Sequence, residues 1–248
     1  MDFENEQQQG LIIGRNAVTE ALRSGRSMDS LLVAKGERGG SVGKIIGQCR
    51  DKGIVVKEVD IRKLDKLCGG ANHQGVAAWA AVHEYSSIED ILSLAESRGE
   101  PPFVIICDEI EDPHNLGAII RTADACGAHG IIIPKRRGVA LTYAVGKVSA
   151  GAVEYVPVAR VANLASTIEE LKEKGFWVYG ADMDGTRWDK QDYSGSVALI
   201  VGSEGRGISR LVKEKCDFIV SLPMKGKINS LNASVAAGIL MYEIAKNR

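Results

Sequence analysis

The sequence predicts an α/β protein in which a small α/β unit precedes a larger domain built on a mostly parallel sheet. From residue 11 onward, short apolar runs alternate with amphipathic helical patterns. From residue 103 the apolar runs lack polar residues at every second position, which is typical of strands covered on both faces. The stretch Gly99-Glu-Pro-Pro102 separates the two parts, because it favours neither helix nor strand.

The first part, residues 11–83, is expected to be one compact unit of four strands and three helices. The strands are expected at Leu11–Ile13, Ser30–Ala34, Ile54–Val59 and Gly75–Val82. The helices are expected at Asn16–Arg23, Val42–Lys52 and Ile61–Leu67. The acidic, glutamine-rich residues 1–10 before it are expected to be a disordered tail.

Residues 84–102 are expected to link this unit to the domain formed by residues 103–248. The linker contains one short helical pattern, Ser87–Arg98, in which Ser87 and Asp90 have the spacing of a capping box. Strands of the second domain are expected at Phe103–Cys107, Gly130–Ile133, Glu154–Val158, Phe176–Ala181, Val197–Gly202 and Phe218–Leu222.

The last helix, expected at Leu231–Ala245, is apolar on nearly all sides and therefore must be buried against more than one neighbour. Two interpretations remain open. The helix lies inside the core of the domain, or it forms an interface with a second copy of the chain in a homodimer.

Composition excludes few classes of function. Aromatic residues make up only 5% of the chain, so RNA binding would not depend mainly on stacked aromatic side chains. The formal net charge of −1 argues against nucleic-acid binding, but residues 11–83 hold 12 Lys and Arg against 7 Asp and Glu. A locally basic surface of this kind fits RNA, and it equally fits an ordinary solvated face.

Five cysteines occur without a C-x-x-C pair, and the four histidines lack ligand spacing with them, so no metal site is expected. Cys107 and Cys126 lie in apolar runs and are expected to be small core residues. The polar N-terminus and the absence of an apolar run of membrane-spanning length predict a cytoplasmic protein without a membrane partner.

The first of three informative stretches, Asp108–Gly127, contains Asp112-Pro-His-Asn115, which signals a turn and a helix start. A lone surface arginine is usually a solvated charge. Arg121, however, lies off the core face, one turn after Gly117, which would leave room for a ligand. The core face is expected to consist of Leu116, Ile119, Ile120, Ala123 and Gly127.

The second stretch, Leu199–Gly207, ends in a turn with glycines at 202, 205 and 207, which would let the backbone approach a flat ligand. A tight strand-to-helix turn is the alternative. The pattern is not the dinucleotide fingerprint, and Glu204 argues against a phosphate cradle. In the third stretch, Ser221–Ser234, two asparagines and two serines lie close together, which exceeds the needs of helix capping. They are Asn229, Ser230, Asn232 and Ser234.

Together these stretches read D-P-x-N-x-G-A-I-x-R-T-A, then V-G-S-E-G-x-G, then L-P-M-x-G-x-x-x-S-L-N-x-S-V-A. Their content and order resemble the three motifs of the SpoU (TrmH-like) RNA 2′-O-ribose methyltransferases of the SPOUT superfamily, over residues 103–248. Residues 13–22 and 72–76 resemble the substrate-binding domain of longer members. The two-domain layout is shared with members that methylate a guanosine of large-subunit (23S) rRNA.

The resemblance implies a C-terminal trefoil knot preceded by an RNA-binding domain, S-adenosylmethionine as cofactor, no metal, and a homodimer. It places the cofactor in the knot, held largely by backbone groups, with Gly202, Leu222 and Leu231 as the main contacts. Further cofactor contacts are expected at Ile200, Ser203, Gly205, Met224 and Asn232.

By the same resemblance, Arg121 activates the ribose 2′-hydroxyl and comes from the subunit opposite to the cofactor. Arginine is not deprotonated in proteins, so we expect it to polarise the hydroxyl and hold the adjacent phosphate. The polar motif residues that would orient Arg121 and the ribose are Asn115, Glu204, Ser230 and Asn232. Candidate phosphate contacts are Arg15, Arg136, Arg137 and Arg206, and helix capping is the alternative for Arg15.

Two other functions remain open. One is methylation of a guanosine in tRNA by a member of the same family, because RNA specificity depends on RNA shape. The other is an RNA-binding protein with an inactive site, which need not bind the cofactor.

Overall fold

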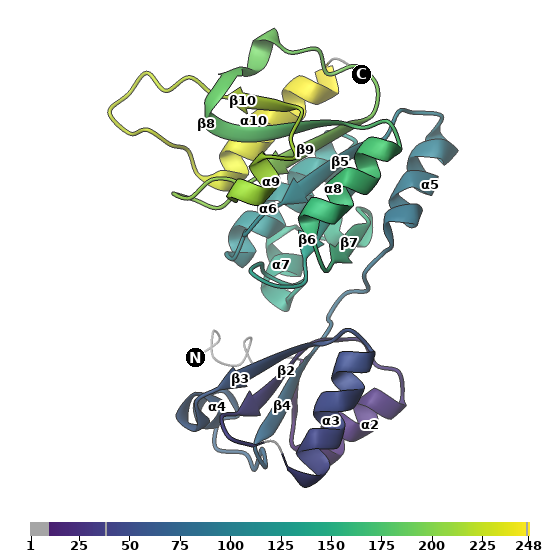
Figure 1. Ribbon diagram of the computed structural model, residues 1–248, viewed down its shortest axis with the longest axis vertical. Coiled ribbons are helices and arrows are strands. Elements are labelled where there is room, and N and C mark those ends of the chain that lie inside the picture. The colour runs from purple at the N-terminus through teal and green to yellow at the C-terminus, as the bar shows by residue number, and fades with distance from the viewer. Residues whose placement is uncertain (1–9, 38, 247) are drawn as a thin grey trace. The chain divides into compact units, whose positions relative to one another are not determined.

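A computed structural model describes residues 10–37, 39–246 and 248 of the chain. The described residues divide into two compact units, one up to residue 84 and one from residue 85 onward (Figure 1). Of the tail predicted at residues 1–10, residues 1–9 lie outside the described residues. Gly10 is tied to the first unit, because its carbonyl accepts the Ala80 N–H at 2.8 Å. Helix α5 (Ile88–Arg98), in the segment expected to be a linker, belongs to the second unit and buries Ile91 and Ala95.

The capping box predicted at the start of α5 is confirmed. The Ser87 hydroxyl accepts a hydrogen bond from the Asp90 N–H at 3.0 Å, and the Asp90 carboxylate accepts one from the Ser87 N–H at 2.7 Å. These hydrogen bonds from Ser87 lower the pKa of Asp90, because they favour its charged form. Gly99 ends the helix in the left-handed conformation.

The first unit contains a four-stranded sheet in the order β1-β4-β2-β3. These strands are β1 (Leu11–Ile13), β2 (Met28–Ala34), β3 (Val55–Val59) and β4 (Val76–Ala80). Strands β2 and β3 are parallel, and β4 is antiparallel to both of its neighbours. The helices are α2 (Arg15–Arg23), α3 (Gly40–Asp51) and α4 (Ile61–Leu67). All seven predicted elements are present, with ends within two residues of the prediction.

Helices cover both faces of this first sheet. Val18 of α2 and Ile45 of α3 pack with Leu31 on one face, whereas Leu64 of α4 packs with Leu32 on the other. Neighbouring strand residues point to opposite faces, so Leu31 and Leu32 belong to different clusters.

The second unit is built on a six-stranded sheet in the order β10-β8-β9-β5-β6-β7, and every pair in it is parallel. The strands are β5 (Phe103–Cys107), β6 (Gly130–Pro134), β7 (Val158–Val161), β8 (Trp177–Arg187), β9 (Val197–Val201) and β10 (Phe218–Ser221). Along β5, Phe103 and Ile105 join one core cluster, whereas Val104 and Ile106 join the other. The predicted parallel sheet, covered on both faces, is therefore confirmed.

Three helices pack on each face of this sheet (Figure 1). One face is covered by α6 (Pro113–Ala125), α7 (Tyr143–Val148) and α10 (Ala233–Lys246). The other is covered by α5, α8 (Leu164–Glu173) and α9 (Arg210–Lys213). Two short 3₁₀ turns, Ala152–Glu154 and Trp188–Lys190, complete the unit. Among the described residues, no helix is long and apolar enough to cross a membrane.

The strand predicted at Glu154–Val158 was wrong. Residues 152–154 form a 3₁₀ turn, Tyr155 is 76% exposed, and the strand begins only at Val158. Pro157 has no N–H to donate to a neighbouring strand, so the preceding apolar residues cannot complete a ladder.

Two glycine assignments on α6 also need correction. Gly127 lies beyond the helix with a φ of 73° and is exposed, so it ends α6 instead of joining its core face. Gly117 leaves no room for a ligand, because a Cβ atom there would lie 2.7 Å from the Cβ atom of Val148. Its missing side chain instead lets α7 pack closely against α6.

Helix α10 is buried on one side only. Ala237, Leu240, Met241 and Ile244 are buried, whereas Val235, Ile239 and Tyr242 are 49%, 38% and 56% exposed. The interpretation of α10 as a wholly internal helix therefore does not hold for one chain by itself.

Candidate active site

The second and third motif stretches form most of a pocket of about 170 Å³ beside the ends of β9 and β10. This is the edge at which parallel α/β sheets present ligand sites. The first stretch reaches it through Asn115, which donates to Glu204 in the pocket wall. The apolar residues of the wall include Val201, Val220, Leu222, Met224, Leu231 and Leu240. Residues 202–207 and 229–231 supply most of the remaining wall. The loop at residues 222–232, seen as the long yellow-green loop in Figure 1, is neither helix nor strand.

The glycine-rich loop closes on itself beside this pocket. The Ser203 N–H donates to the Gly207 carbonyl at 3.1 Å, and the Gly207 N–H donates to the Ser203 carbonyl at 2.9 Å. A Cβ atom on Gly202 would lie 2.1 Å from the Gly207 backbone, so only glycine allows this close contact. Gly202 is therefore required by the fold of the loop itself.

Three polar motif residues from distant parts of the sequence form one hydrogen-bonded cluster. The Asn115 side-chain amide donates to Glu204 Oε1 at 3.1 Å. The Asn232 side-chain amide donates to Asn115 Oδ1 at 2.8 Å and also to Glu204 Oε1. Asn115 is only 7% exposed, so its polar atoms depend on these partners. The cluster joins the starts of α6 and α10 to the glycine-rich loop.

Asn232 has a second task, because it caps α10. Its Oδ1 atom accepts hydrogen bonds from the backbone N–H groups of Ser234 at 3.0 Å and Val235 at 3.3 Å. Capping therefore explains the acceptor end of this side chain, as the sequence suggested. The donor end is left for Asn115 and Glu204.

Most predicted cofactor contacts line the pocket. They are Gly202, Ser203, Gly205, Leu222, Met224 and Leu231, joined by Ser230 from the predicted catalytic set. Ile200 does not line it, because its side chain is buried in the cluster on the opposite face of the sheet. Its neighbour Val201 points to the pocket instead. Asn232 does not line the pocket either, and its side chain belongs to the polar cluster.

Arg121 is exposed on α6 and does not line the pocket of its own chain. It lies on the part of α6 that carries Ala118 and Thr122. These two residues line a shallow apolar hollow with Val235, Gly238, Ile239 and Tyr242 of α10. Arg121 is thus placed beside the uncovered face of α10.

The predicted phosphate contacts fall into two groups. Arg137 and Arg206 both approach the Glu109 carboxylate, at 3.5 and 3.9 Å, and are 81% and 85% exposed. Arg136 is also exposed. These three arginines therefore present charge to solvent near the loops that form the site.

Arg15, in the first unit, instead joins parts of that unit together. Its Nε atom donates to the Gln74 carbonyl at 2.8 Å, and its guanidinium pairs with Glu37 at 3.4 Å. Arg15 does not cap α2, because Gly14 is the N-cap residue and a guanidinium has no acceptor for the N–H groups of the helix start.

Two residues of β8 that the sequence analysis did not assign to the site belong to the pocket. Asp182 and Met183 line it from a bulge in β8. The predicted strand ended at Ala181, so an acidic residue directly after it was the available signal.

Asp108 was quoted in the first motif without a role. Its carboxylate accepts the Ser209 N–H at 2.7 Å and ties the end of β5 to the segment after the glycine-rich loop.

Among the described residues, no group of three or more His, Cys, Asp or Glu side chains could hold a metal ion. Cys107 is buried, and burial raises the pKa of its thiol to about 12, so it remains protonated near neutral pH. Cys126, predicted to be a core residue, is only half-buried.

Comparison with known proteins places this site in a class. Residues 102–242 match the model of the SpoU rRNA Methylase family, and residues 11–86 match the model for RNA 2′-O ribose methyltransferase substrate binding. YacO of Bacillus subtilis (strain 168), named as a TrmH family tRNA/rRNA methyltransferase, is 52% identical over 244 residues, 98% of this chain and 97% of its own. A relative of the same description from Staphylococcus haemolyticus is 48% identical over 240 residues, 96% of each chain.

A solved structure supports the same fold. The SpoU methyltransferase AviRb from Streptomyces viridochromogenes, in complex with the cofactor AdoMet, has a TM-score of 0.60 and 23% identity over 99% of this chain and 93% of its own. The fold and the family models define an RNA methyltransferase with its own substrate-binding domain. The chain belongs to the SpoU rRNA methylase family.

Proposed function

We propose that this RNA methyltransferase transfers the methyl group of S-adenosylmethionine to the ribose 2′-hydroxyl of a guanosine in 23S rRNA. The observation that carries the proposal is the pocket formed by the second and third motif loops, which the Asn115–Glu204–Asn232 cluster ties to the first motif. Helix capping and closure of the glycine-rich loop do not by themselves require these contacts between distant segments.

The pocket fits the adenosine part of S-adenosylmethionine. Leu222, Met224 and Leu231 offer apolar surface to a neutral base. The irregular backbone of residues 222–232 offers peptide groups outside any helix or strand, as edge recognition of a base requires. When bound, the cofactor supplies an electrophilic methyl group on a sulfonium centre.

Arg121 acts on the ribose in this proposal. Its guanidinium polarises the 2′-hydroxyl and holds the neighbouring phosphate, and the proton leaves through that phosphate or water. Ser230, in the pocket wall, contacts the reacting nucleotide. The cluster of Asn115, Glu204 and Asn232 acts indirectly, because it holds the loop beside Ser230 and the start of α6 that leads to Arg121.

A homodimer accounts for the position of Arg121 outside its own pocket. The exposed apolar face of α10, with Val235, Ile239 and Tyr242, lies beside Arg121 and needs a cover. A second copy that covers this face would bring its own Arg121 towards the pocket of the first. The active site then consists of residues from both chains.

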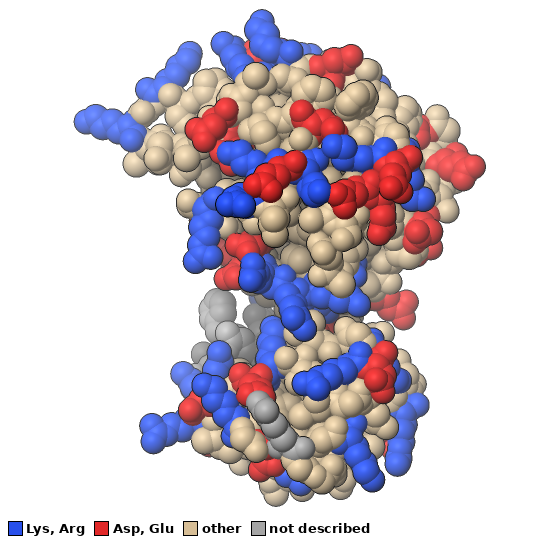
Figure 2. Space-filling model, viewed as in Figure 1, with Lys and Arg blue, Asp and Glu red and all other residues tan. Residues whose placement is uncertain are grey.

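The remaining family features complete the proposal. The C-terminal segment that includes the loop at residues 222–232 forms the trefoil knot. Residues 11–83 form the RNA-binding domain, and Arg15, Arg136, Arg137 and Arg206 contact phosphates. On the face shown in Figure 2, Lys and Arg side chains border the first unit on several sides, which suits an RNA backbone. The protein acts in the cytoplasm, where its five free cysteines stay reduced.

Transfer of radiolabelled methyl groups from S-adenosylmethionine tests this function, with unmodified 23S rRNA and unmodified tRNA as separate substrates. We expect label in 23S rRNA alone, recovered as 2′-O-methylguanosine after digestion. Label in tRNA alone would change the substrate and keep the enzyme. An absence of label in both, with no cofactor binding by calorimetry, would favour an inactive RNA-binding protein.

A further inference from the structure

A bulge in β8 places one carboxylate in the wall of the pocket. Strand β10 pairs with β8 at Ile219 and Gly180, but the next pair is Val220 and Thr186. Residues 181–185 therefore leave the ladder between these two pairs. Bulges of this kind redirect side chains and are common beside active sites. Here the bulge carries Asp182 to the pocket.

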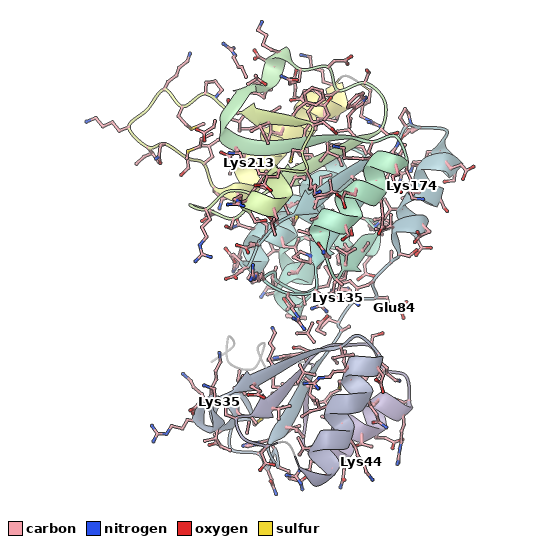
Figure 3. The ribbon with its side chains drawn as sticks, viewed as in Figure 1. Lys35, Lys44, Glu84, Lys135, Lys174 and Lys213 are labelled. Carbon is pink, nitrogen blue, oxygen red and sulfur yellow. The ribbon has the colours of Figure 1, made fainter. Side chains whose placement is uncertain are left out.

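Asp182 is held in place from two sides. Lys213 of α9, labelled in Figure 3, places its Nζ atom 3.0 Å from Asp182 Oδ2. The backbone N–H of Asp184 donates to Asp182 Oδ1 at 3.4 Å. The Asp182 side chain is only 15% exposed, and its Oδ2 atom would lie 3.4 Å from a Cβ atom on Gly207. It is thus fixed against the glycine-rich loop.

The pocket wall contains three charged residues: Asp182, Glu204 and Arg206. Glu204 is occupied by Asn115 and Asn232, and Arg206 approaches Glu109. Asp182 and Glu204 both retain acceptor capacity, because a carboxylate has about four lone-pair sites. Glu204, however, is exposed and its Oε1 atom holds the polar cluster, whereas Asp182 is only 15% exposed and fixed in the pocket wall. The known partners of Asp182 use two of its lone-pair sites.

We propose that Asp182 accepts hydrogen bonds from the ribose hydroxyls of the cofactor's adenosine and fixes the sugar in the pocket. This inference rests on the proposed function. S-adenosylmethionine offers two kinds of group to a carboxylate: the hydroxyl donors of its ribose, and the cationic sulfonium and ammonium centres. The ion pair between Asp182 and Lys213 favours the hydroxyl donors over the cationic centres. It offsets the negative charge and so weakens attraction for a cation, but it leaves lone pairs for O–H donors.

Calorimetric titration of three ligands tests this assignment in the wild type and in Asp182→Asn. The ligands are S-adenosylmethionine, S-adenosylhomocysteine without the sulfonium charge, and 5′-methylthioadenosine without the amino-acid part. All three carry the same ribose, so we expect Asp182→Asn to weaken all three by a similar factor of about ten or more. Asp184→Asn is the matched control, because Asp184 lies 3.8 Å from the same lysine but is 88% exposed and outside the pocket wall. This control should bind like the wild type.

The 2′-deoxy and 3′-deoxy forms of 5′-methylthioadenosine make the test specific for the hydroxyls. At least one of these deoxy compounds should bind the wild type more weakly than 5′-methylthioadenosine does. In Asp182→Asn this difference in affinity should largely disappear. Loss restricted to the two ligands with an amino group would overturn the proposal in favour of ammonium binding. The proposal would also be overturned if Asp182→Asn bound all three ligands as tightly as the wild type does. It would be overturned as well if removal of a ribose hydroxyl reduced affinity equally in both proteins.

Failure of the proposed function gives a different result. In that case the wild type binds none of the three ligands, and the inference falls with it. Thermal unfolding of each variant shows whether the fold is retained. If Asp182→Asn unfolds, Lys213→Met serves as the second variant. It removes the ion pair that fixes the Asp182 carboxylate in the pocket wall, so binding of the uncharged ligand 5′-methylthioadenosine should fall. Retained affinity for this ligand would contradict the proposal.

Discussion

The double task of Asn232 gives a prediction whose size can be worked out from its contacts. Replacement by alanine removes the cap of α10, which accepts from Ser234 and Val235, at a cost of about 0.5–2 kcal/mol. It also removes the donor to Asn115 Oδ1. Because Asn115 is 7% exposed, an acceptor left without a partner there costs about 1–3 kcal/mol more. We expect Asn232→Ala to lower the free energy of unfolding by about 1.5–5 kcal/mol.

Asn163→Ala is the matched control, because Asn163 caps α8 in the same unit through Ala165 and Ser166. It should cost only the capping energy of about 0.5–2 kcal/mol. Asn232→Ser keeps a capping hydroxyl, but the serine side chain is too short to reach Asn115. Its cost should therefore be near that of the unpaired Asn115 acceptor alone, about 1–3 kcal/mol. Urea unfolding at one fixed protein concentration measures all three variants, because a dimer's stability depends on concentration. The reasoning is refuted if Asn232→Ala costs no more than Asn163→Ala.

Four further predictions address the site and the fold. Arg121→Ala should abolish methyl transfer and leave cofactor affinity nearly unchanged in calorimetry; an equal loss of cofactor binding would contradict its assigned role. Gly202→Val should abolish cofactor binding and lower the melting temperature, because its Cβ atom would clash with the Gly207 backbone; retained affinity would show that the loop is not needed for binding. Val235→Glu should reduce the mass seen by light scattering from two chains to one, and a mass of two chains would exclude α10 as the interface. Burial lowers the pKa of His129 below its ordinary value of 6.5, so the unfolded chain takes up the proton first as the pH falls. The contribution of His129 to the free energy of unfolding should therefore be complete above about pH 6.5 and decrease below it. Urea unfolding from pH 8 to pH 5 measures this decrease, which should be smaller in His129→Gln.

The sequence predicted the order and type of most elements because the strands are short apolar runs bounded by clear turn residues. It could not tell which face of a strand meets the pocket. Along β9 every residue is buried, so no alternation of polar and apolar residues distinguishes Ile200 from Val201. The side of the sheet that carries the pocket depends on packing, so the sequence could not show that the side chain of Val201, and not that of Ile200, lines the pocket.

Contacts between distant segments set the second limit. Gly117 lacks a side chain because α7 packs against it, and no local pattern contains that information. The bulge that carries Asp182 arises from a change in pairing between β8 and β10, which are separated by β9 in sequence. Motif similarity placed Asn115, Glu204 and Asn232 in one site, but only the structure shows that they contact one another.

The most direct test of 2′-O-methylation is chemical. A 2′-O-methyl group blocks the hydroxyl that attacks the adjacent phosphodiester in alkali, so the modified nucleotide leaves a gap in an alkaline hydrolysis ladder. After incubation of 23S rRNA with S-adenosylmethionine, the wild type should produce one gap at a guanosine, and Arg121→Ala should produce none. Incorporation of label into the RNA without any gap would show methylation of a base, and it would contradict the account of this site.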